Sequence, residues 1–99
     1  MNVNVQTVNF DADVKLLELV QRKMGKLSTF HDRIIQTDVY LKLDNVVHTI
    51  KDKIVEIEVH IPKYKFFVKS TSKSFEQSFD DAFNSIVNQV KRRKEKLIA

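Results

Sequence analysis

The chain has 99 residues, of which 42% are hydrophobic, and it contains one glycine, one proline and no cysteine. This length and composition predict a single domain over residues 1–99, and they exclude disulfides, thiolate nucleophiles and cysteine-based metal sites. The N-terminus lacks the basic and apolar regions of a signal peptide, and no apolar run is long enough to span a membrane. We therefore expect a cytoplasmic protein without a membrane partner.

The positive charge is concentrated near the C-terminus. The chain carries 17 Lys and Arg residues against 13 Asp and Glu residues, a net charge of +4. Residues 89–99 hold five of the basic residues and one of the acidic ones, which leaves 12 of each and no net charge in residues 1–88. A localised positive field attracts a polyanion, whereas dispersed lysines mainly keep a protein soluble. The charge pattern therefore favours a polyanionic partner.

A strand and a helix are predicted in the first third of the chain. Residues 1–8 alternate between apolar or β-branched side chains and polar ones, which is typical of a half-buried strand. An apolar stripe then predicts an amphipathic helix over residues 12–27, capped by Asp11 or Asp13. The stripe consists of Leu16, Leu17, Val20, Met24 and Leu27. Gly25 either lies within this helix, at a cost of about 1 kcal/mol relative to alanine, or ends it early.

Three further strands follow. Alternating apolar and polar side chains predict strands over residues 37–43, 53–61 and 64–72, with a loop over residues 44–52. Pro62 ends the middle strand, because proline cannot donate a hydrogen bond to a neighbouring strand.

The second helix has the clearest signal. Ser74 followed by Gln77 matches a capping box, which predicts a helix start at this point. Apolar residues then recur at helical spacing, and the helix is expected to end near residue 96. These residues are Phe75, Phe79, Ala82, Phe83, Ile86 and Val90. The basic run occupies the last two turns.

The predicted element order is β-α-β-β-β-α. A helical crossover between the first two strands makes them parallel, whereas the short later connections make the remaining pairs antiparallel. Each strand has one apolar face and one polar face. The sequence thus predicts an α+β fold, with a four-stranded sheet, two helices packed on one face and the other face in water.

No catalytic or metal site is predicted, and no cofactor or small-molecule substrate is expected. His31, His48 and His60 lie on separate elements without metal-ligand spacing, and we interpret them as surface or loop histidines. A single glycine excludes the glycine-rich loops that bind nucleotide phosphates. We therefore expect a protein that is not an enzyme.

Two glutamates on one strand face need a separate interpretation. Glu56 and Glu58 share the polar face of the strand over residues 53–61, where a pair of carboxyl groups is one possible acid and base. Lysines on the neighbouring strands favour cross-strand ion pairs instead. The candidate lysines are Lys42, Lys65 and Lys69.

The basic run has two interpretations. It is either a solvated helix end that complements the helix dipole, or a surface that binds phosphates through Arg forks and Lys charges. The RNA-binding residues predicted on this helix are Lys91, Arg92, Arg93, Lys94 and Lys96. If the two helices pack side by side, Arg22, Lys23 and Lys26 of the first helix join them.

Stacking aromatics give a weaker signal. Tyr40 and Phe67 are expected on the open face of the sheet, where RNA-binding sheets stack bases. The aromatic and glycine string of such sheets is absent from the sequence, and Glu56 and Glu58 lie on the same face. The sequence therefore favours contacts to the RNA backbone over base reading.

Two stretches and the element order carry a family resemblance. The stretches are residues 20–27 (VQRKMGKL), followed by Phe30 and Ile34-Ile35, and residues 86–94 (IVNQVKRRK). In these features the whole chain resembles the ribosome hibernation promoting factor and ribosome-associated inhibitor family, some members of which are called sigma-factor modulation proteins. The resemblance implies a fold like a double-stranded-RNA-binding domain with an extra leading strand.

The resemblance also implies a function. Members of this family bind the small ribosomal subunit and its ribosomal RNA at the decoding region, in the place of messenger RNA and of transfer RNA. They silence translation in stationary phase or stress. Position by position, the resemblance implies RNA contacts by Lys23, Lys26, Lys91, Arg92 and Lys94, with Arg93 adjacent to them.

The sequence departs from the family pattern at several positions. Many members have a basic residue at the position of Asn88, and an Asp and a Tyr at the positions of Ser74 and Glu76. The end at Ala99 resembles a short form without the linker and dimerisation domain of longer members. The resemblance leaves open whether ribosomes are paired with a helper protein or held singly. The alternative function is a protein-interaction module that regulates a transcription factor through the basic helix.

Overall fold

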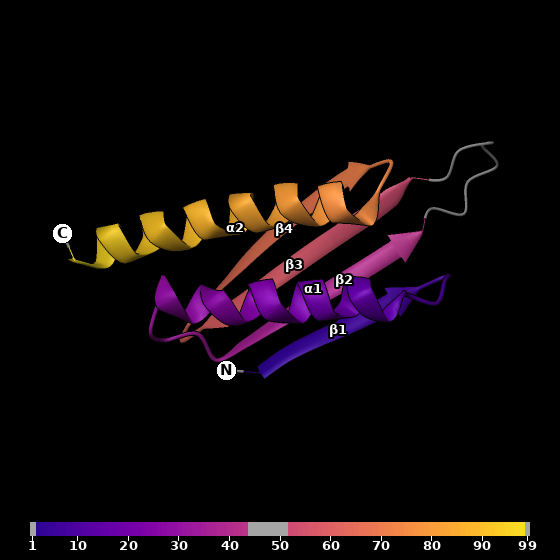
Figure 1. Ribbon diagram of the computed structural model, residues 1–99. Helices are drawn as coiled ribbons and strands as arrows, with labels where there is room; N and C mark the ends of the chain where they lie inside the picture. Colours follow the sequence, from indigo (N-terminus) through magenta and orange to yellow (C-terminus); the bar gives the residue numbers. More distant parts are fainter. Residues whose placement is uncertain (1, 44–51, 99) are drawn as a thin grey trace.

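The computed structural model describes residues 2–43 and 52–98, with side chains up to residue 93. Its elements follow the predicted order β-α-β-β-β-α, with one additional short helix (Figure 1). They are β1 (Asn2–Val8), α1 (Val14–Gly25), the 3-10 helix η1 (Lys26–Thr29), β2 (Gln36–Leu43), β3 (Lys53–Ile61), β4 (Tyr64–Ser72) and α2 (Phe75–Ile98). Of the predicted loop over residues 44–52, residues 44–51 lie outside the described residues.

The four strands form one sheet in the order β1-β2-β3-β4. β1 pairs with β2 in parallel, and the other two pairs are antiparallel, as predicted. Both helices cover the same face of the sheet, and α2 packs against β3 and β4 (Figure 1). The two helices run in the same direction, so their C-terminal ends lie at the same end of the sheet. The likeness to a double-stranded-RNA-binding domain stays a prediction.

The hydrophobic core lies between the sheet and the two helices. Alternate residues of the central strands face the helices and are fully buried, because a strand directs successive side chains to opposite faces. From the sheet these are Val39, Leu41, Val55, Ile57 and Val59. From the helical segments they are Val20, Met24, Leu27, Phe79, Ala82, Ile86 and Val90. Complete burial of one large apolar side chain stabilises the fold by about 1.5–3 kcal/mol.

The first helix begins at a polar cap and ends at a glycine. Asp13 is its N-cap, and the Lys15 amide donates a hydrogen bond to the Asp13 carboxylate at 3.2 Å. The α-helix ends at Gly25, which confirms the alternative of an early end, and the chain continues as η1. In η1 the Ser28 hydroxyl donates to the Gly25 carbonyl, and this tighter turn still buries Leu27 in the core. The predicted helix over residues 12–27 was therefore too long as an α-helix.

The second helix begins with half of the predicted capping box. The Gln77 amide donates to the Ser74 hydroxyl at 3.1 Å. The Gln77 side chain donates to Asp81 at 2.9 Å, whereas the Ser74 amide donates to the Ser72 hydroxyl at 3.3 Å. In a complete capping box the Ser74 amide would donate to the Gln77 side chain. Here it donates instead to Ser72, the last residue of β4. The helix extends to Ile98, slightly beyond the predicted end near residue 96.

Candidate nucleic-acid interface

The basic run of α2 divides between two sides of the helix. Successive helical side chains are about 100° apart, so Lys91 and Arg93 point to opposite sides. The Lys91 ammonium lies 4.7 Å from the ring centroid of Phe30, which follows η1. The Arg93 guanidinium lies 4.2 Å from the ring centroid of Tyr64, the first residue of β4. Arg92 lies between them in the sequence and is exposed. Aromatic rings therefore position two cations at one end of the fold.

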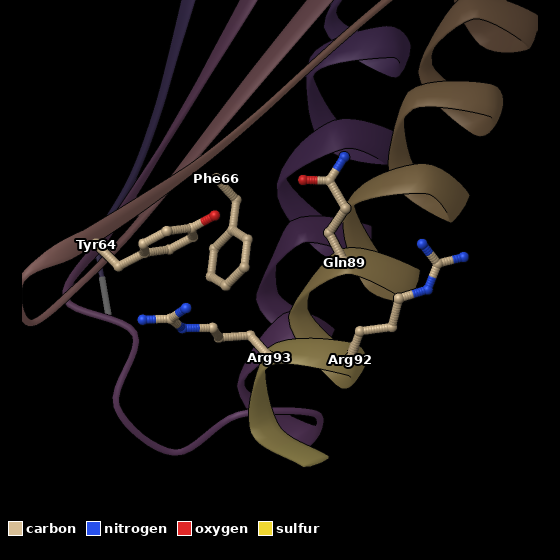
Figure 2. A pocket seen from close by; sticks show the side chains of 5 residues that line it. All are labelled: Tyr64, Phe66, Gln89, Arg92 and Arg93. Carbon is tan, nitrogen blue, oxygen red and sulfur yellow. The ribbon is translucent and has the colours of Figure 1, made fainter. Parts of the chain in front are cut away.

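A pocket lies between the start of β4 and the second half of α2 (Figure 2). It has a volume of about 150 Å³ and is lined by Tyr64, Phe66, Gln89, Arg92 and Arg93. Phe66 is buried, whereas Tyr64 is 44% exposed, and their rings meet edge to face with centroids 4.9 Å apart. In Figure 2, Arg93 extends beneath the Tyr64 ring and Arg92 diverges from it. The Arg93 Nε–H is buried and has no hydrogen-bond partner among the described residues.

The predicted cations of the first helix have different surroundings. Arg22 and Lys26 are exposed, at the C-terminal end of α1 and the start of η1. The Lys23 ammonium forms an ion pair with Asp80 of α2 at 2.9 Å. This pair joins the two helices and offsets the Lys23 charge. Exposed ion pairs stabilise a fold by only about 0–1 kcal/mol, so a phosphate can compete with Asp80 for Lys23.

The last two predicted cations lie near the end of α2. Lys94 and Lys96 belong to the helix, but their side chains lie outside the described residues. The structure thus brings Arg92 and Arg93 together at the pocket and sets Lys91 on the side of η1. It places Lys23 against Asp80.

Three residues of the pocket were not predicted as site residues: Tyr64, Phe66 and Gln89. Part of the signal was in the sequence, because residues two apart on a strand share a face and residues four apart on a helix share a side. Tyr64 and Phe66 have the first spacing, and Gln89 and Arg93 have the second. The missing information was that the start of β4 lies beside the second half of α2, which depends on tertiary packing.

The open face of the sheet carries the predicted ion pairs. Glu56 pairs with Lys42 at 3.1 Å, and Glu58 pairs with Lys65 at 3.6 Å. Phe67 lies across from Glu58 on this face and is 46% exposed, as predicted. The glutamates are therefore cross-strand ion partners.

On the same face, His60 belongs to a polar cluster. This cluster was not predicted from the sequence. Its Nε2 lies 3.2 Å from Asp38 and 3.6 Å from Glu58. Burial of Asp38 would raise its pKa, but hydrogen bonds from Gln36, Asn4 and His60 hold the pKa below the ordinary value of 3.8. Of the described residues, Asp38, Glu58 and His60 form the group that could hold a metal ion, with ligand atoms within 4.8 Å of one another. Hydrogen bonds from Asn4, Gln36 and His60 already satisfy the Asp38 carboxylate.

The other histidines have separate positions. His31 is buried rather than on the surface, and its Nδ1 accepts a hydrogen bond from the Arg33 amide at 3.1 Å. It therefore stabilises the connection before β2. His48 lies outside the described residues.

Neither helix, over the residues described, is long and apolar enough to cross a membrane.

Comparisons with known proteins place the chain in a family. A comparison with curated proteins found no match. The ribosomal subunit interface protein of Coxiella burnetii has a similar structure, with a TM-score of 0.83, 18% identity and coverage of 96% of this chain and 99% of that one. The Protein Y N-terminal domain of Thermus thermophilus gives a TM-score of 0.78, 24% identity and coverage of 93% and 98%.

At these identities, the two structures show a common fold. The family model for the sigma 54 modulation protein and S30EA ribosomal protein matches residues 3–98, which confirms the resemblance found in the sequence. The chain belongs to the sigma 54 modulation protein and S30EA ribosomal protein family.

Proposed function

We propose that this protein binds the small ribosomal subunit at the decoding region, where it excludes messenger and transfer RNA and silences translation in stationary phase or stress. The observation that carries the proposal is the run of Lys91, Arg92 and Arg93 on the second half of α2, in a chain with no net charge before residue 89. Family membership supports the ribosome as the partner. The site of action is then the cytoplasm.

The cations have distinct roles in this proposal. Arg92 offers a planar fork of donors that matches two phosphate oxygens, whereas Lys91 acts as a point charge. Lys23 exchanges Asp80 for a phosphate when RNA approaches the two helices. About four phosphate contacts would give a slope of roughly −3 to −4 when the logarithm of the binding constant is plotted against that of salt concentration.

Co-sedimentation with purified ribosomes and separated subunits tests the proposal. The wild-type chain is compared at near-physiological salt with the variant Lys91→Gln/Arg92→Gln/Arg93→Gln. A matched control, Lys63→Gln/Lys65→Gln/Lys69→Gln, removes the same charge from exposed residues at and after the β3–β4 turn. Circular dichroism first confirms that both variants fold. We expect the wild type and the control to sediment with the small subunit and the α2 variant to remain at the top of the gradient.

A second function is favoured by the family description, which names modulation of sigma 54. In that function the basic half of α2 meets an acidic surface of a transcription factor. Nuclease treatment separates the two functions, because a complex with a protein survives it and a complex through ribosomal RNA does not.

A further inference from the structure

We propose that the pocket lined by Tyr64, Phe66, Gln89, Arg92 and Arg93 is a nucleotide subsite that takes one unstacked base, with the attached phosphate on Arg92. The inference rests on the proposed function for its natural ligand, an RNA nucleotide. Its chemistry applies equally to a free nucleotide. It differs from the sequence-based expectation, which favoured backbone contacts and looked for aromatics only on the open sheet face.

The pocket has rigid aromatic walls. Tyr64 and Phe66 share a strand face, and their edge-to-face contact fixes the angle between the rings at 72°. Phe66 is buried, whereas nearly half of Tyr64 remains exposed. Single-stranded nucleic acids bind by stacking bases on such aromatic rings, and the gain is about 1–3 kcal/mol per base. An exposed tyrosine beside clustered arginines is therefore suited to a base.

The polar groups of the pocket complement the edge of a base. Gln89 lies one helical turn before Arg93 and lines the pocket with an amide that both donates and accepts hydrogen bonds (Figure 2). The same amide chemistry reads the edge of adenine in other nucleic-acid complexes. Arg93 contributes a guanidinium plane, and bases stack on such planes as they do on aromatic rings. Three lining residues thus match a flat ring with donors and acceptors at its edge.

An unsatisfied donor supplies independent evidence for a ligand. The Arg93 Nε–H is buried and lacks an acceptor among the described residues, although buried polar groups are nearly always hydrogen-bonded. Arg93 is held in this position by Tyr64, 4.2 Å from the ring centroid. A ligand acceptor that enters between Tyr64 and α2 would satisfy this donor.

The size of the pocket and its neighbouring charge select the ligand. About 150 Å³ suits a single base better than a folded peptide segment. Arg92 is exposed at the margin, where it meets a phosphate without entering the pocket. A base with an attached phosphate contacts both the exposed part of the Tyr64 ring and Arg92, whereas inorganic phosphate would make no use of the Tyr64 ring.

Nuclear magnetic resonance of the full chain tests the subsite. Adenosine monophosphate is titrated against ribose 5-phosphate, which has the same phosphate and sugar but lacks the base. We expect adenosine monophosphate to shift the ring resonances of Tyr64 and Phe66 and the side-chain amide of Gln89 through the ring current of the bound base. Ribose 5-phosphate is expected to shift only resonances near Arg92.

Variants assign the shifts to the pocket. Tyr64→Leu and Gln89→Ala are expected to weaken binding of adenosine monophosphate by about fivefold or more, and Tyr64→Phe is expected to keep it. Phe67→Ala removes an exposed ring from the opposite sheet face and should leave binding unchanged. Equal ring shifts with both ligands, or the same affinity in Tyr64→Leu, would overturn the subsite.

Co-sedimentation distinguishes this result from the proposed function. A wild-type chain that sediments with the small subunit but shows no base-dependent shifts overturns the subsite alone. Base-dependent shifts in a chain that does not bind ribosomes support the subsite and contradict the proposed function.

Discussion

The guanidinium of Arg93 lies over the ring of Tyr64, 4.2 Å from its centroid, and so connects the charged end of α2 to the first residue of β4. Contacts of this kind stabilise a protein by about 0.5–2 kcal/mol. The contact also restricts where the guanidinium can go, because the Tyr64 ring is itself held by Phe66. The fold itself thereby holds a cation in a defined position near the end of a long helix.

Arg93→Lys separates charge from shape at this contact. The variant keeps the positive charge but loses the planar guanidinium, which stacks on aromatic rings better than an ammonium group. We expect affinity for the small subunit to fall severalfold with an unchanged salt slope. Arg93→Gln should also lower the magnitude of the slope by about 0.7–0.9. Binding isotherms at several salt concentrations measure both effects, and identical slopes for the two variants would contradict this role.

Asp80→Asn tests the ion pair between α1 and α2. The substitution frees Lys23 and removes one negative charge from α2. We expect the free energy of unfolding to fall by at most about 1 kcal/mol, while affinity for the small subunit rises. Asp32→Asn, in the exposed connection before β2, removes the same charge from a residue outside this ion pair and is the matched control. Equal gains in both variants would mean that only net charge matters.

Asp38→Asn tests the polar cluster on the sheet. Hydrogen bonds hold the pKa of Asp38 below 3.8, so the unfolded chain binds a proton there more readily than the folded protein does. The stability from Asp38 is full above its unfolded pKa and is lost as pH falls through the lower folded pKa. Denaturant unfolding at a series of acidic pH values should show that the free energy of unfolding falls less steeply with decreasing pH in Asp38→Asn than in the wild type. Asn4→Ala should be intermediate, whereas parallel curves for all three proteins would refute the mechanism.

Ser74→Ala and Gln77→Ala test the start of α2. The Ser74 hydroxyl accepts a hydrogen bond from the Gln77 amide, so its removal should lower the free energy of unfolding by about 1 kcal/mol. The Gln77 side chain contacts Asp81 instead of completing the capping box. Its removal should therefore change stability by no more than about 0.5 kcal/mol. Thermal unfolding of the two variants measures both changes in stability. Equal losses of stability would indicate a complete capping box in solution.

Period and turn signals were enough to predict most of the fold. β3 and β4 have the predicted bounds because their alternating side chains separate a buried face from a wet one, and Pro62 ends the first of them. The ion pairs of Glu56 and Glu58 followed from the same alternation. These features depend on neighbours close in the sequence or on adjacent strands, where the sequence pattern is informative.

Features set by long-range packing were not predictable in this way. Asp38 and His60 come together only through the register of β2 with β3, and Lys23 meets Asp80 only because α1 packs beside α2. The pocket requires the start of β4 to lie against the second half of α2. The sequence left open whether the α-helix ends at Gly25. This residue has an ordinary right-handed backbone, which fits either a helix interior or a helix end.

Competition on the small ribosomal subunit tests whether the protein occupies the decoding region. Labelled protein is added to small subunits that are either empty or already carry messenger RNA and transfer RNA in the P site, and the bound fraction is measured at near-physiological salt. If the protein occupies the decoding region, it binds empty subunits, is excluded by the bound RNAs, and in turn slows their binding. Equal binding to empty and loaded subunits would contradict the proposed function, because the protein and the RNAs would then occupy separate sites.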